Sequence, residues 1–147
     1  MKIFLRIFFI LFLFSLVPGP VFSEETLSPE QIERVKACKR LLEEIDTKPL
    51  PRTLRELERS TYPELHLRIM EAMANTYVEL VREHKVVKLK DKHWLYGMIA
   101  MNMANLQFGG GIEGDRDAAL NHLIQRKLLE HLPANIAEHP GFSKSVE

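Results

Sequence analysis

Hydrophobic side chains recur every three or four positions along four stretches of the chain, which is the spacing of helices with a buried face. The first stretch opens with a helix start: Ser28 can cap, Pro29 suits a first turn and Gln31 completes a capping box. Its core-facing positions share one side and are Val35, Cys38, Leu42 and Ile45. The pattern predicts a surface helix over residues 28–46.

A proline-rich connector separates this stretch from the next two predicted helices. Residues 48–51 contain two prolines and are predicted not to be helical, because proline lacks an N–H and restricts its predecessor. Thr53 and Thr61 each stand three residues before a glutamate, which is the spacing of a capping box. We therefore expect a short helix over 54–59 and a long one over 62–84. Two adjacent apolar rows on the long helix predict contact with more than one neighbour.

The next predicted helix, residues 92–108, belongs to a run that carries no charge. No residue from Trp94 to Ile112 is charged, and apolar side chains occur on every side of the helix. A helix of this kind is typical of the centre of a fold, so we expect it to be the central one. Gly97, Ala100 and Ala104 fall within a narrow arc, where we expect a neighbouring helix to approach closely.

A glycine run, residues 109–111, ends that helix because glycine tolerates positive φ, and Asp115 is placed to cap a last helix over 115–132. The core-facing residues of the last helix are Leu120, Leu123, Ile124, Leu128 and Leu132. The sequence thus predicts an all-α fold, a small helical bundle of four main helices plus a short connecting helix.

Residues 1–23 have the features of a secretory signal peptide. Lys2 precedes an apolar run over 7–17 that is too short to span a bilayer. Val21 and Ser23 then place suitable side chains three and one positions before Glu24. We expect cleavage there, a single all-helical domain over 24–147, and an exported protein that is periplasmic or extracellular. An uncleaved N-terminal anchor is the alternative.

Charge and cysteine content narrow the classes of partner. The chain has 20 basic and 20 acidic residues, and loss of the signal peptide leaves 18 and 20, so we expect no nucleic-acid partner. Asn102, Asn105 and Gln107 make the uncharged run costly in lipid, so we expect no membrane contact beyond the signal peptide.

Cys38 is the only cysteine, which excludes an intramolecular disulfide, and its place among apolar positions predicts a buried, unreactive thiol.

Catalytic and metal-binding motifs are not found in the sequence. Met98, Met101 and Met103 point in different directions on a helix, so their sulfurs cannot converge on one ion. The six histidines form no metal-ligand spacing, and no Gly-x-Ser-x-Gly elbow occurs. We therefore expect no catalytic residue, metal or cofactor. A b-type haem or other ligand inside the bundle, and a hydrolase of envelope polymers using Glu113 or Asp115, remain alternatives.

These observations favour an exported, non-catalytic helical binding or adaptor protein that acts through protein–protein contacts. The predicted contact surface is the connector before residue 92, whose lysines offer charge and whose apolar residues offer burial. Its candidate residues are Lys85, Lys88, Leu89 and Lys90. The alternative site is the glycine-rich loop, with Gly109, Gly111, Ile112 and Glu113. Residues 109–119 resemble the loop between paired helices of Sel1-type repeats, but no second copy follows, so we derive no function from the resemblance.

Overall fold

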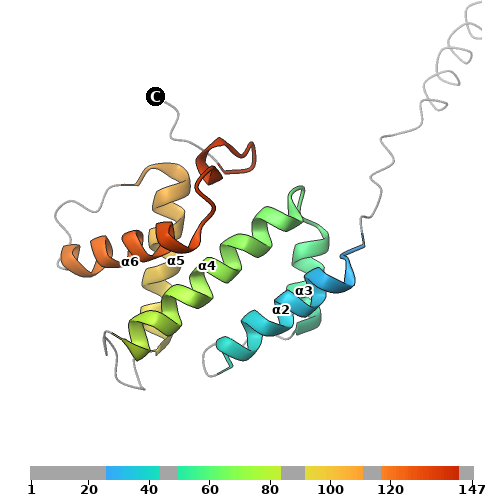
Figure 1. The fold of residues 1–147 in the computed structure, drawn as a ribbon, viewed down its shortest axis with the longest axis horizontal. Helices are drawn as coiled ribbons and strands as arrows, with labels where there is room; N and C mark the ends of the chain where they lie inside the picture. The colour runs from blue at the N-terminus through green and yellow to red at the C-terminus, as the bar shows by residue number, and fades with distance from the viewer. Residues whose placement is uncertain (1–25, 44–49, 84–91, 111–116, 143–147) are drawn as a thin grey trace, which may run out of the picture.

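The computed structural model describes residues 26–43, 50–83, 92–110 and 117–142 (Figure 1). The elements in these ranges are α2 (Pro29–Leu41), α3 (Leu50–Glu58), α4 (Pro63–Arg82), α5 (Lys92–Phe108), α6 (Ala118–His131) and the 3₁₀ helix η2 (Ile136–Glu138). The prediction of a small all-α bundle with four main helices and a short connecting helix is confirmed. The predicted signal peptide lies outside the described residues.

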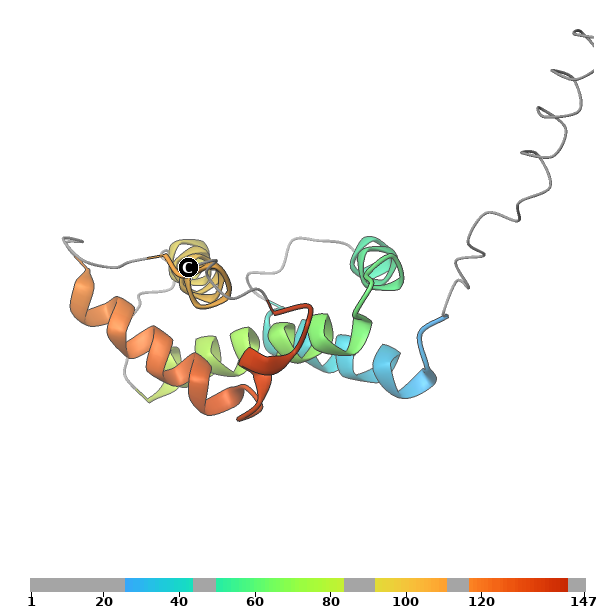
Figure 2. The same cartoon turned by 90° about the horizontal axis from the view of Figure 1, so that it is seen from above.

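Helix α4 is the centre of the fold. It packs against α2 and α3 on one side and against α5 and α6 on the other (Figure 1). Seen from above, α2, α4 and α6 form one layer, and α3 and α5 both stand on the same side of it (Figure 2). The expectation that two apolar rows give the long helix several neighbours is confirmed. The expectation that 92–108 is the central helix is wrong, because α5 packs mainly against α4 and α6.

Two apolar clusters hold the helices together. A small cluster joins the start of α2 to α3 and α4 and consists of Leu27, Val35, Leu57 and Leu67. The main cluster fills the space between α4, α5 and α6, and at its centre are fully buried residues: Ala74, Leu80, Leu95, Ile99, Ile124 and Leu128. Burying apolar surface contributes about 25 cal/mol per Å² to stability, so these contacts supply the main stabilising term.

The helix termini agree with the sequence in part. Ser28 caps α2 in the predicted capping box with Gln31. The expectation that Pro51 lies outside a helix is wrong, since it occupies the first turn of α3, where no N–H is required. Because α3 begins at Leu50, Thr53 lies inside the helix and not at its N-cap. The N-cap of α4 is Tyr62 in place of Thr61, and it makes no side-chain cap hydrogen bond.

Buried amides connect α5 to α6. The Asn102 side chain is fully buried, and its Nδ2 donates to the Met98 carbonyl at 2.9 Å and to Asn121 Oδ1 at 2.8 Å. Gln125 Nε2 in turn donates to Asn102 Oδ1 at 3.1 Å. Because buried polar groups cost free energy unless they are paired, these hydrogen bonds fix how the two helices meet.

Candidate docking surface on helix α5

The outer side of α5 exposes three large apolar side chains. Trp94 is 48% exposed, Met101 41% and Phe108 65%. The residues are seven positions apart, so each lies two turns from the next and about 20° from it around the helix axis. Figure 2 shows that the layer formed by α2, α4 and α6 lies on one side of α5. The three side chains therefore form one row along the whole helix.

Small residues accompany the row, and all of them are exposed. Gly97, Ala100 and Ala104 lie on the outer side of α5, and a Cβ added at Gly97 would meet no atom within 4 Å. The prediction that a neighbouring helix approaches these residues closely is therefore wrong within the described fold. The physical reason is that α5 buries the opposite arc, which contains Leu95 and Ile99.

We call Trp94, Gly97, Met101, Ala104 and Phe108 the outer row. These five positions span about 80° of the helix circumference, and their 3–4 spacing is that of a helix-packing seam. The three large side chains together leave on the order of 300 Å² uncovered, given the areas that aromatic side chains carry. Steps of three and four residues also relate the buried positions Leu95, Ile99 and Asn102, so spacing alone does not distinguish the outer row in the sequence.

The concentration of apolar surface on α5 is unusual for this protein. Of the six large hydrophobic side chains that are exposed in the described ranges, three belong to the outer row. The other three lie on different elements, at Leu41, Tyr62 and Leu129. Single exposed hydrophobic residues are normal on protein surfaces, whereas a contiguous apolar patch of several hundred Å² is often a contact site.

Most of the contact residues predicted from the sequence lie outside the described ranges. This holds for Lys85, Lys88, Leu89 and Lys90, and equally for Gly111, Ile112 and Glu113. Gly109 is described: it follows α5 with φ of 73°, and its N–H donates to the Asn105 carbonyl at 2.7 Å. Its conformation confirms that glycine ends this helix through positive φ.

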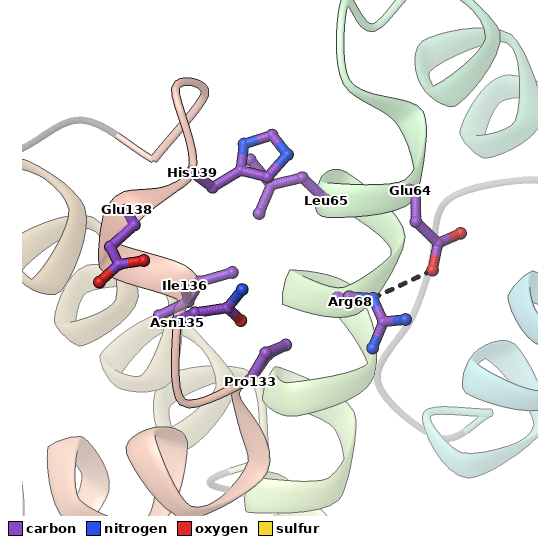
Figure 3. A pocket seen from close by; sticks show the side chains of 8 residues that line it. All are labelled: Glu64, Leu65, Arg68, Pro133, Asn135, Ile136, Glu138 and His139. Carbon is purple, nitrogen blue, oxygen red and sulfur yellow. Dashed lines mark ion pairs between the residues drawn. The ribbon is translucent and has the colours of Figure 1, made fainter.

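A pocket of about 520 Å³ opens between the first turns of α4 and the segment after α6 (Figure 3). Leu65, Pro133 and Ile136 give it apolar walls, while Glu64 and Glu138 lie on opposite walls. The remaining lining residues are Arg68, Asn135 and His139. Sequence reasoning did not identify this pocket, because its walls are distant in the chain.

The electrostatics of Glu64 do not suit acid catalysis in this pocket. Arg34 Nη1 donates to both Glu64 oxygens at 2.8 and 3.0 Å, and Arg68 and Gln31 contact the same carboxylate. Burial alone would raise the pKa of Glu64, but the hydrogen bonds and charges of these partners outweigh it and lower the pKa. Glu64 therefore stays ionised. A second pair of hydrogen bonds from Arg34, both 2.7 Å, holds Glu71 and ties α2 to α4.

The other residues considered for chemistry have structural surroundings. Cys38 is 3% exposed, and burial raises the pKa of its thiol to about 11, as expected for an unreactive core cysteine. Met103 is buried whereas Met101 is exposed, which confirms that the methionine sulfurs diverge. His131 lies 3.0 Å from Glu79 and His139 packs edge-on against Tyr62.

Among the described residues, no group of three or more His, Cys, Asp or Glu side chains could hold a metal ion. Within the same ranges, no helix has the length and apolar character needed to cross a membrane. The chain matches no protein-family model, no curated protein and no solved structure.

Proposed function

We propose that this chain is an exported helical binding protein that contacts a protein partner through the outer row of α5. The observation that carries the proposal is the exposure of Trp94, Met101 and Phe108 on one uncharged side of a helix whose opposite side is anchored in the core. Tryptophan, phenylalanine and methionine are enriched in protein interfaces, and tryptophan is among the residue types that supply most of the binding free energy there.

The size of the surface supports a contact of modest affinity. Covering on the order of 300 Å² of apolar surface at about 25 cal/mol per Å² corresponds to roughly 8 kcal/mol before the costs of association. Those costs consume much of this free energy, so additional contacts would strengthen binding. The lysines that precede α5 in the sequence, Lys85, Lys88 and Lys90, are proposed to add charge that steers an acidic partner.

Site-specific photo-crosslinking in the cells that make the protein tests this proposal. A photoreactive amino acid replaces Ala104 in the outer row, and a matched variant carries it at Ala37, an exposed alanine of α2. We expect a discrete protein adduct of the exported chain at position 104 and none at position 37. Equal adducts at both positions, or no protein adduct at position 104, would refute the proposal.

A charge-reversal variant tests the contribution of the connector. Replacing Lys88 and Lys90 with glutamate should lower the yield of the position 104 adduct at low salt, and the difference should shrink as salt is added. An unchanged yield would remove the lysines from the docking surface and leave the outer row as the sole contact.

A further inference from the structure

The segment after α6 returns to the start of α4 and ends at a buried aromatic side chain. Phe142 is 6% exposed and belongs to the main apolar cluster. Its N–H donates to the His139 carbonyl at 2.8 Å, and the His139 N–H donates to the Ile136 carbonyl at 3.1 Å. Residues 139–142 therefore form a tight turn that continues from η2 and leads the chain into the core (Figure 1).

Gly141, inside this turn, lies so close to α4 that no larger residue fits. A Cβ added at Gly141 would clash with the Tyr62 ring and lie 2.9 Å from Leu65 Cδ2. The Gly141 N–H donates to Nδ1 of the His139 ring at 3.0 Å, in a hydrogen bond that is part-buried. The rings of His139 and Tyr62 meet edge to face, with centroids 5.1 Å apart. Because a covered N–H costs free energy when it has no acceptor, the ring nitrogen helps to hold the turn.

The direction of this hydrogen bond requires one protonation state of His139. An imidazole nitrogen accepts a hydrogen bond only when it carries no proton, so the ring is neutral with its proton on Nε2. A second proton would make Nδ1 a donor that faces the Gly141 N–H, and the contact would become repulsive. Histidine is the side-chain type whose charge ordinarily changes between about pH 5 and 8. The turn is therefore held by a contact that only the uncharged form of this residue type can make.

Charged groups from two elements line the pocket beside His139. Glu138 precedes it in the chain, and Glu64 and Arg68 belong to α4 (Figure 3). Glu64 and Arg68 form an ion pair with each other at 3.1 Å, and Glu64 also accepts hydrogen bonds from Arg34. A protonated His139 ring is therefore attracted mainly by Glu138, on the wall opposite α4, and this attraction draws the ring away from α4.

We infer that His139 is a pH-sensitive latch for the turn formed by residues 139–142. The neutral ring accepts the Gly141 N–H and holds the turn against α4, and the protonated ring releases it. Release uncovers Leu65, which Gly141 covers in the latched turn, and so widens the pocket on an apolar side. This inference is independent of the docking surface on α5.

NMR of the isotope-labelled protein, in the processed form that cells accumulate, tests the inference. The nitrogen shifts of the imidazole report the protonation state of His139, and backbone relaxation reports the order of Gly141 and Phe142. When the pH is lowered from about 8 to about 5, we expect the order parameters of both amides to fall from roughly 0.85 to below about 0.6 as the ring gains its proton.

Two substitutions at position 139 separate the hydrogen bond from the ring packing. His139→Asn supplies an uncharged oxygen that can accept from the N–H two residues later, and the following Pro140 favours such a turn. This variant should stay ordered at both pH values. His139→Phe keeps a ring against Tyr62 but has no acceptor, so its turn should be mobile at both. His122→Asn, at an exposed position of α6, is the matched control and should respond to pH as the wild type does.

The inference fails if any part of the latch is dispensable. A wild-type turn that stays ordered after His139 is protonated would show that the hydrogen bond does not hold it, and so would an ordered turn in His139→Phe. A ring that stays neutral down to about pH 5 would leave no switch in the range where histidine ordinarily titrates. Loss of order in His139→Asn at low pH would assign the response to another group.

Discussion

Replacing Gly97 with alanine should stabilise the protein, although the residue lies in the middle of α5. Glycine inside a helix costs about 0.8–1 kcal/mol relative to alanine, because its backbone loses more freedom on folding. The added methyl group causes no clash, since nothing lies within 4 Å of its position. The full gain in helix propensity should therefore appear as about 1 kcal/mol of stability. For a domain of this size, that corresponds to a rise in Tm of roughly 3–5 °C.

Urea denaturation followed by circular dichroism measures this change, at a protein concentration where the chain is monomeric. Ala104→Gly is the matched control on the same exposed side and should lose a similar free energy. Ala74→Leu tests a buried position of α4 and should cost about 1–3 kcal/mol through overpacking. If Gly97→Ala destabilises the monomer, another part of the chain packs against α5, and the assignment of an open outer row is wrong.

Two further substitutions and one labelling experiment test contacts within the fold. Asn102→Ala should cost about 2–3 kcal/mol in urea denaturation, because the partner amide of Asn121 loses a buried hydrogen bond. Arg34→Lys should cost about 1 kcal/mol by the same measurement, since lysine cannot reproduce the two-point contact with Glu71, and an unchanged stability would show that this fork contributes nothing. Native Cys38 should react with a thiol reagent about 100-fold more slowly than in denaturant at pH 8, since its pKa of about 11 against a usual 9 leaves far less thiolate, and its rate should keep rising up to about pH 11.

Helix positions were predictable where the local pattern alone determines them. Helix α5 has the predicted bounds, 92–108, because an uncharged run and a glycine stop define both its character and its end. The start of α2 was predictable for the same reason, since the Ser28–Gln31 capping box and Pro29 all lie within a single turn. The start of α3 was not, because proline is compatible both with a connector and with a first helical turn, and the sequence alone does not choose.

The packing of α5 was not predictable from its composition. An apolar residue contributes the same pattern whether it faces the core or an uncovered surface, so Met101 and Met103 could not be told apart. The exposed row was missed for the same reason. Gly97 and Ala104 were interpreted as a place of close helix approach, which small residues allow only when a neighbour is present. The pocket beside Glu64 depends on contacts between distant segments, which helical periodicity does not report.

The buried amides between α5 and α6 determine which side of α5 is exposed. A turn of α5 by a single residue step would rotate it by about 100° and carry Asn102 away from Asn121 and Gln125. Apolar contacts alone would resist this rotation weakly, because α5 has hydrophobic side chains on all sides. The amides thus fix the rotation of α5 about its own axis and keep Trp94 and Phe108 on its exposed side, where the proposed docking surface lies.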